Sequence, residues 1–408
     1  MESEPPDEPA PQLSRFQIWL GRLRLGAGVL LCVVGILPFV PSPGRLAWML
    51  GIGVTEWGHW FALPALALLL PGWRRTAAAK LGALLGLIAA GLALSTIVRA
   101  SFLSDDVARK VSESFPGIEP RAHENAPARS KPFHWIDAVL AIPTPFVEMK
   151  TVDYVTRGTQ TLKMDVYSPP VTGAPAPGVL LIHGGAWRGG SRDELPALNR
   201  YLAARGYVVA SIDYRLAPQS PFPAATDDIR AAIDYLKNHS LELGLDADRI
   251  ALFGRSAGGH LALLSAYTIE ENSIRGVVAV YPPTDLPYAH ANPSNPRLLD
   301  SKQALEDFLG GSPASNPTAY QQASPVNFVK SQTVPTLLIH GAHDEFVYKI
   351  HSQKLCDKLS EHSVPHFLLE IPWGNHGCDA NLSGPGGQLS LYATERFLAS
   401  VLRVRRGE

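Results

Sequence analysis

The hydrophobic pattern divides the chain into two regions of different character. Long uncharged runs fill residues 25–100, where only six charged residues occur. From residue 148 onward, short apolar runs alternate with amphipathic stretches, which is typical of a folded domain of strands and helices. The pattern therefore predicts an N-terminal segment at 1–24, a membrane region at 25–100, a linker at 101–147 and a globular domain at 148–408.

Three uncharged runs in the first region are long enough, or nearly so, to cross a bilayer as helices. They cover residues 25–44, 57–73 and 81–98, and a spanning helix needs about 17 to 25 mostly apolar residues. The first run ends in a cluster of proline and glycine, which predicts a turn at the membrane surface. We therefore expect an N-terminal bundle of about three transmembrane helices that anchors the chain in the lipid bilayer.

The middle run is expected to form a span over 46–70, with ionisable and aromatic residues near its start. Glu56 and His59 have Trp57 and Trp60 as neighbours. One interpretation is an intramembrane ionisable pair. The other is a polar helix end at the lipid headgroups, where tryptophan is common. The aromatic neighbours favour the second.

Basic residues flank these runs unevenly and predict the orientation, because cytoplasmic loops carry an excess of lysine and arginine. Six lie on the side of the N-terminus and two on the other side. The two sets are Arg15, Arg22, Arg24, Arg74, Arg75 and Lys80 against Arg45 and Arg99. The N-terminus is therefore expected in the cytoplasm, and three crossings place the globular domain outside it. If the middle run does not cross, this parity reverses.

The globular region predicts an α/β fold with a mostly parallel sheet flanked by helices. The runs 151–156 and 161–168 alternate polar and apolar residues, as an antiparallel hairpin does. Later runs are continuously apolar, which is typical of strands covered on both faces. These runs are 178–183, 207–214, 249–254, 276–281, 336–341 and 367–371, and helical stretches are expected at 195–204, 224–238, 257–268, 350–359 and 389–402. Ligand sites in such sheets lie beyond the carboxyl ends of the strands.

One long irregular stretch interrupts this alternation at residues 282–329. It is rich in proline, asparagine and serine, with one short helical piece near 301–309. An insert of this length in a compact domain is usually a lid or a binding element. We expect it to shape a pocket together with Trp187.

The strongest chemical signal is a serine between a strand and a helix. The strand RIALF leads directly into GRSAGG, so that Gly254, Ser256 and Gly258 form a G-x-S-x-G motif. A sharp strand-to-helix turn exposes the serine, and small flanking residues let the strand and the helix approach closely. Ser256 is therefore the predicted nucleophile.

A serine nucleophile needs a base and a group that orients the base. Asp344 follows one apolar strand and His376 follows the next, and the order Ser256, Asp344, His376 matches that of nucleophile, acid and histidine in hydrolases. The remaining candidates are expected to have other roles: His340 and His366 are structural, and Glu345 and Asp379 are solvated loop charges. His343 is a further rival that precedes the acid.

The loop HGGAW at 183–187 follows the first continuous strand and predicts donors for an oxyanion. Small residues let backbone amides approach a substrate oxygen without obstruction. Gly184, Gly185 and Ala186 are the candidates in this loop, and Ala257 is the candidate after the nucleophile.

Taken together, the motifs resemble those of a known family. HGGAW, DYRLAP at 213–218, GRSAGG, HGAHD and NHG at 375–377 occur in the order found in α/β-hydrolases of the hormone-sensitive-lipase-like carboxylesterase group. The chain from 152 to 402 is similar also to bacterial feruloyl and acetyl-xylan esterases. The resemblance implies a serine esterase that acts on ester substrates, although Ala186 stands where the lipase-like group usually has a third glycine.

Residues next to these motifs are expected to have structural roles. Asp213 and Arg215 within DYRLAP are predicted to form a pair that fixes their loop, and His260 to act in packing or as a cap. Cys356 and Cys378 either form a disulfide or remain two free thiols.

Composition excludes several other function classes. The net charge of −1 leaves no basic field for nucleic acid, and no metal-binding or phosphate-binding motif occurs in the sequence, so no metal or cofactor is expected. The sequence thus predicts a membrane-anchored serine hydrolase of the inner membrane that cleaves carboxylic esters outside the cytoplasm. A serine peptidase on the same fold and a non-catalytic, membrane-tethered binding module are the alternatives.

Overall fold

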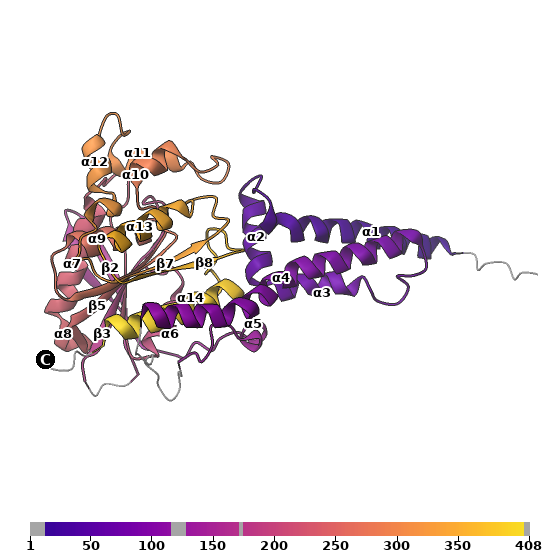
Figure 1. Ribbon diagram of the computed structural model, residues 1–408, viewed down its shortest axis with the longest axis horizontal. Helices are drawn as coiled ribbons and strands as arrows, with labels where there is room; N and C mark the ends of the chain where they lie inside the picture. The colour runs from indigo at the N-terminus through magenta and orange to yellow at the C-terminus, as the bar shows by residue number, and fades with distance from the viewer. Residues whose placement is uncertain (1–12, 116–127, 171–173, 404–408) are drawn as a thin grey trace, which may run out of the picture.

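The chain folds into an α/β domain from which an arm of helices projects (Figure 1). This computed structural model describes residues 13–115, 128–170 and 174–403. Half of the predicted segment 1–24 and part of the predicted linker therefore lie outside the described residues.

An eight-stranded sheet forms the centre of the domain, in the order β1-β2-β4-β3-β5-β6-β7-β8. Only β2 runs against its neighbours, and the other strands share one direction. The strands are β1 (Met149–Arg157), β2 (Gln160–Tyr167), β3 (Ala176–Ile182), β4 (Val208–Ile212), β5 (Leu245–Arg255), β6 (Ile274–Val280), β7 (Thr336–Gly341) and β8 (His366–Ile371). The predicted hairpin and the predicted parallel strands are confirmed.

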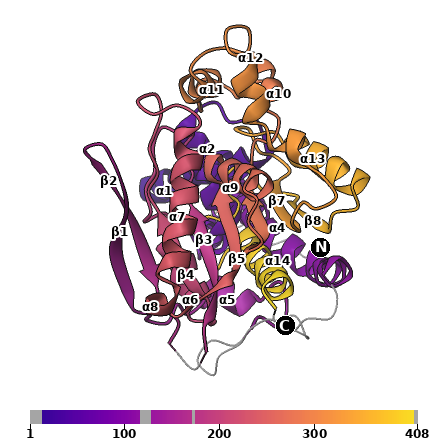
Figure 2. The ribbon, with the colours of Figure 1, turned by 90° about the vertical axis from the view of Figure 1, so that its left-hand side faces the viewer.

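Helices cover both faces of the sheet and enclose two apolar cores (Figure 2). Successive residues of β3 point to opposite cores: Leu180 and Ile182 to one, Val179 and Leu181 to the other. The flanking helices are α6 (Pro196–Ala203), α7 (Ala224–Asn238), α8 (Ser240–Leu243), α9 (Ala257–Thr268), α13 (Ile350–Glu361) and α14 (Pro385–Val401). The strand sequences are continuously apolar because both faces of the sheet are buried, as the sequence predicts.

The insert between β6 and β7 is more ordered than its composition predicts. The expected helix is present as α11 (Ser301–Leu309), and three further short elements accompany it: α10 (Leu286–Ala291), α12 (Pro317–Gln322) and η2 (Pro325–Phe328). Asp285 caps α10 by accepting from the Tyr288 amide. The helices of this insert stand together at one edge of the domain (Figure 1).

The arm contains two helices that are long and apolar enough to cross a membrane, Arg15–Phe39 and Ala77–Ser114. The prediction of a single middle span over 46–70 is wrong. The chain breaks at Trp57, and only the second of the two resulting helices, with the turns that follow it, returns along the arm. The arm elements are α1 (Arg15–Ile36), η1 (Leu37–Phe39), α2 (Arg45–Glu56), α3 (Gly58–Ala67) and α4 (Ala77–Ser114).

Small residues bring the helices of the arm together. Gly28 packs so closely on α4 that an added Cβ would lie 2.6 Å from the Gly82 carbonyl oxygen. Gly21 and Gly35 lie about two helical turns before and after Gly28 and are near Thr76 and Leu92, so α1 and α4 run in parallel. A parallel pair requires a return of the chain between its members, and α3 runs antiparallel to α4 in that place.

The segment that follows the predicted membrane region is not a simple tether. Helix α4 continues to Ser114, and Val107 and Val111 pack in the core beneath α14. Further on, the short helix α5 (Trp135–Leu140) is held against α14, where the His134 amide donates to Gln388. The boundary expected at residue 101 therefore falls inside a continuous helix.

Candidate active site

Ser256 occupies the sharp turn between β5 and α9. Its backbone lies at φ 53° and ψ −120°, a strained conformation for a residue with a side chain. Gly258 has no room for a Cβ, because the carbonyl oxygens of Ile182 and His183 lie against its Cα. The glycine therefore permits the close strand-to-helix approach that leaves the Ser256 hydroxyl free of the sheet.

The structure brings the three predicted side chains together at the carboxyl ends of the strands. His376 Nε2 lies 3.0 Å from Ser256 Oγ, and His376 Nδ1 lies 2.8 Å from Asp344 Oδ2. Asp344 and His376 are buried, whereas Ser256 is partly exposed. A hydroxyl, an imidazole and a carboxylate thus form one hydrogen-bonded row that ends at a solvent-accessible oxygen.

Backbone amides hold the Asp344 carboxylate in place. Its Oδ1 accepts from the amides of Phe346 and Val347 at 2.8 and 2.9 Å. Burial raises the pKa of Asp344, but the charge of His376 and hydrogen bonds from His340 and His376 outweigh burial and hold that pKa well below its usual range. Asp344 is therefore present as a carboxylate and accepts from His376.

The other histidines near the site have structural partners. His340 is buried, with Nδ1 at 2.7 Å from Ser352 Oγ and Nε2 at 2.8 Å from the Val347 carbonyl oxygen. The ring of His366 contacts the Val364 carbonyl oxygen. His343 is exposed and its backbone amide donates to Gly374.

The expectation that Glu345 and Asp379 are solvated loop charges is wrong. Asp379 is buried and pairs with Arg255, and it also accepts from the Tyr281 hydroxyl at 2.7 Å. Glu345 accepts from Ser42 and Asn375, as described below. Their partners come from distant parts of the chain, so local sequence could not reveal them.

The predicted oxyanion loop has an unusual backbone. Gly185, Ala186 and Trp187 all have positive φ, at 110°, 52° and 58°. The Gly184 amide donates to Glu194 Oε2 at 3.1 Å and is therefore occupied. Glu194 lies outside every motif, so nothing in the sequence indicates this contact.

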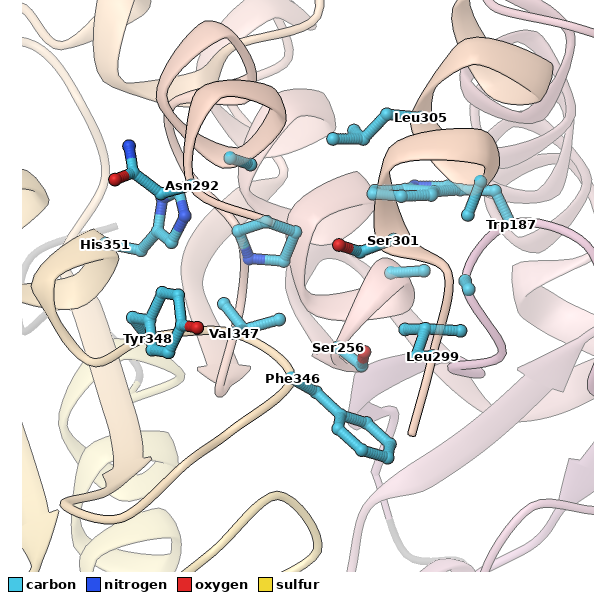
Figure 3. Close-up of a pocket in the computed structure, with 15 residues that line it drawn as sticks. Trp187, Ser256, Asn292, Leu299, Ser301, Leu305, Phe346, Val347, Tyr348 and His351 are labelled. Carbon is cyan, nitrogen blue, oxygen red and sulfur yellow. The ribbon is translucent and has the colours of Figure 1, made fainter. Parts of the chain in front are cut away.

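A small apolar pocket opens beside Ser256 (Figure 3). Its volume is about 40 Å³, enough for a few water molecules. It is lined by Trp187, Leu299, Leu305, Phe346, Val347 and Tyr348, together with smaller residues. The insert and Trp187 both contribute to this lining, as the sequence suggested.

Trp187 links the oxyanion loop to the insert. Its ring stacks on Phe308 of α11 with centroids 4.7 Å apart, and its Nε1 donates to His260 Nδ1 at 3.1 Å. His260 Nε2 in turn donates to the Ala323 carbonyl oxygen. Burial lowers the pKa of His260 to about 4, so the ring is neutral and can accept from Trp187. His260 thus has the structural role expected of it, since it joins Trp187 to the backbone at Ala323.

The predicted pair of Asp213 and Arg215 does not form. Asp213 accepts from Arg192, and Arg215 instead pairs with the fully buried Asp228 on α7. Both residues still fix their loop, but through separate partners.

The thiols and the metal-binding groups add no further site within the part of the chain that the structure describes. Cys356 and Cys378 are free, so no disulfide joins them. No cluster of three or more histidine, cysteine, aspartate or glutamate side chains could hold a metal ion among those residues.

Comparisons with known proteins find relatives of the globular domain. A family model described as BD-FAE matches residues 164–359. The probable carboxylic ester hydrolase LipM of Mycobacterium tuberculosis is 32% identical over 258 residues, which cover 58% of this chain and 58% of LipM. The esterase LipC of the same organism is 31% identical over 246 residues, or 57% of this chain and 60% of LipC. The matched part thus spans less than two thirds of either relative.

A solved structure extends the comparison to the fold. The esterase of Pyrobaculum calidifontis is 26% identical and superposes with a TM-score of 0.55, covering 63% of this chain and 86% of that chain. The chain therefore has the α/β-hydrolase fold, and the relatives to which it is similar are named carboxylic ester hydrolases and esterases.

Proposed function

We propose that the protein hydrolyses carboxylic esters through an acyl-enzyme intermediate on Ser256. The observation that carries the proposal is the row of hydrogen bonds from Ser256 through His376 to Asp344, with a free oxygen at the pocket end. The names of the curated relatives support the same reaction class.

The proposed reaction uses His376 first as a base and then as an acid. Its Nε2 takes the proton of Ser256 as Oγ attacks the ester carbonyl carbon, and it then gives this proton to the departing alkoxide oxygen. Asp344 stabilises the imidazolium that forms in between. A water molecule then gives a proton to the same nitrogen as its oxygen attacks the acyl carbonyl carbon. This proton passes to Ser256 Oγ when the bond to the acyl group breaks, and the carboxylic acid leaves.

The proposed oxyanion hole differs from the sequence expectation in one residue. The Gly184 amide already donates to Glu194, so it is not a donor to substrate. The amides of Gly185, Ala186 and Ala257 remain as donors, and Ala257 begins α9, whose positive end faces the developing charge. Glu194 thus fixes the loop by accepting from its first amide.

The direct test uses purified full-length protein and nitrophenyl esters. We expect hydrolysis of short acyl esters and stoichiometric labelling by a fluorophosphonate, with the label on Ser256 by peptide mass spectrometry. The corresponding nitroanilides separate an esterase from a peptidase, because only a peptidase cleaves both at comparable rates. A folded protein that neither reacts nor takes the label would exclude an esterase and favour a binding module.

We infer further that the arm lies in a lipid bilayer. Support comes from its two long apolar helices and from side chains that α1 and α4 expose, such as Leu30, Val33 and Leu84. The outer face of α5, with Trp135 and Leu140, is also exposed and apolar at the base of the arm, and would rest on the membrane surface.

We retain the predicted orientation, and the parallel course of α1 and α4 supports it. The chain passes along the arm three times, with α3 as a short return. Arg24 donates to the carbonyl oxygens of Leu70 and Pro71 where this return ends. The six basic residues lie at the end of the arm far from the domain, so a cytoplasmic location of that end places the domain outside the cytoplasm.

Reporter fusions in a bacterial host test this topology. We expect alkaline phosphatase fused after Glu408 to be active and the same enzyme fused after Arg75 to remain at background, because phosphatase folds only outside the cytoplasm. Green fluorescent protein at the same two positions is the reciprocal control. Activity at Arg75 with none at Glu408 would reverse the orientation, and activity at both would exclude a cytoplasmic end of the arm.

A further inference from the structure

Helix α2 and the loop before it lie against the two loops that carry Asp344 and His376. Trp48, Ile52 and Glu56 follow one another at intervals of four residues, so they share one face of α2, and each contacts the globular domain. We propose that Ser42 and Trp48 are positioning residues for the acid and the histidine, so that catalysis depends on the arm. This inference rests on the esterase function proposed above.

Ser42 forms the first link between the arm and the site. Its amide donates to Glu345 Oε1 at 2.8 Å, and its hydroxyl donates to Glu345 Oε2 at 2.5 Å. Glu345 directly follows Asp344 in the chain. The pair is largely screened from solvent, since Ser42 is only 5% exposed, and buried charge-assisted hydrogen bonds of this kind are strong.

Glu345 is connected to the loop of His376 through hydrogen bonds with Asn375. The Asn375 side-chain amide donates to Glu345 Oε2 at 3.2 Å, and its oxygen accepts from the backbone amides of Glu345 and His376 at 3.3 and 2.7 Å. One asparagine thus joins the loop of the acid to the loop of the base. Ser42 holds the carboxylate to which that asparagine is bound.

Trp48 forms a second, independent link. Its ring stacks on Phe346 with centroids 4.6 Å apart and planes 24° from parallel. The Phe346 ring lies 5.0 Å from the ring of His376, lines the pocket and belongs to the residue whose amide binds Asp344. Trp48 therefore supports a side chain that touches the imidazole.

The rest of α2 is fixed to the same region. Ile52 covers Gly377, where an added Cβ would lie 3.1 Å from Ile52 Cδ1. Glu56 is fully buried and accepts from the Gly386 and Gly387 amides at the start of α14. Its carboxylate thus caps a helix of the globular domain, although Glu56 and Gly386 are 330 residues apart in the sequence.

Helix α2 is equally fixed to the arm. The Thr96 hydroxyl of α4 donates to the Thr55 carbonyl oxygen at 3.0 Å, and Phe61 of α3 lies against Gly53. A rigid helix with contacts on both sides transmits a displacement of the arm to the catalytic loops. A misplacement of about 1 Å at a reacting group can cost roughly 100-fold in rate.

Kinetics of full-length variants in one detergent test this inference. We expect Ser42→Ala and Trp48→Ala each to lower kcat for nitrophenyl acetate by about 10- to 100-fold, with KM changed by less than about twofold, because the pocket keeps its lining. Ser42→Thr and Trp48→Phe retain the hydroxyl and the stacked ring, so they should restore most of kcat. End-point labelling with a fluorophosphonate counts competent sites and corrects for unfolded protein.

Leu46→Ala and Met49→Ala are the matched controls, because both residues are on α2 but exposed, at 71% and 56%. We expect their kcat within twofold of the wild type. The inference is overturned if the Ser42 and Trp48 variants match these controls, or if their whole loss disappears after correction for competent sites. An inert wild type would overturn the esterase function as well, whereas an active wild type with unaffected variants overturns this inference alone.

Discussion

Replacement of Ser256 by alanine is expected to abolish ester hydrolysis, with a fall in kcat of roughly 10⁴- to 10⁶-fold. Removal of the nucleophile from a serine hydrolase leaves only the contribution of the oxyanion donors and of substrate binding. We propose this hydroxyl as the reacting group because Ser256 lies on a strained turn, with its Oγ 3.0 Å from His376 Nε2. The measurement is steady-state hydrolysis of a nitrophenyl ester, together with fluorophosphonate labelling.

Ser265→Ala is the control for this change. Ser265 lies on the same helix and is fully buried, but it is away from the pocket. We expect this variant to retain activity and labelling, and both variants to unfold at temperatures close to that of the wild type. Labelling of the Ser256→Ala protein at another serine, with activity retained, would show that the nucleophile has been misassigned.

Replacement of Asp344 by asparagine is expected to lower kcat by about 10⁴-fold while leaving the fold intact. Asp344 accepts from His376 Nδ1 and from two backbone amides, and asparagine would present an amide group at one of these positions. The imidazole would then lose the partner that selects the tautomer with a free Nε2. Steady-state kinetics should therefore show a large fall in kcat with KM nearly unchanged.

Asp357→Asn, on the exposed side of α13, is the matched loss of one negative charge and should leave kcat unchanged. The lowered pKa of Asp344 adds a pH dependence with a definite sign. A carboxyl with a lowered pKa stays ionised as the pH falls, so its protonation should not limit the rate at pH 5. If Asp344→Asn retained more than a tenth of wild-type kcat, the acid would have to be another residue.

The strand pattern and the positions of the three proposed catalytic residues after strands could be predicted from sequence, because each depends on local constraints. A strand buried on both faces must be apolar throughout, and each of the predicted runs appears in the sheet. Ser256, Asp344 and His376 could be selected because each follows a strand, and parallel strands end at one edge. The glycines around Ser256 are required by the turn itself.

Other expectations failed where a long-range partner decided the outcome. The run over 46–70 has the composition of a span, yet α2 turns away to pack on the globular domain and α3 alone returns along the arm. Glu56 was expected at a polar helix end, but it is buried as the cap of α14. Gly184 was expected to donate to substrate, but Glu194 accepts from its amide.

By itself, the order of amino acids determined the two regions of the chain, the class of the sheet and the three side chains proposed for catalysis. These features follow from burial, from backbone geometry and from the position of loops after strands, which local sequence encodes. Only the tertiary structure decided that Ser42 and Trp48 of the arm contact the loop of Asp344 and that Glu56 caps α14. The residues in these contacts are far apart in the sequence, by 303 positions for Ser42 and 330 for Glu56. No local pattern specifies such contacts, because they contribute free energy only when the two surfaces meet in the folded chain.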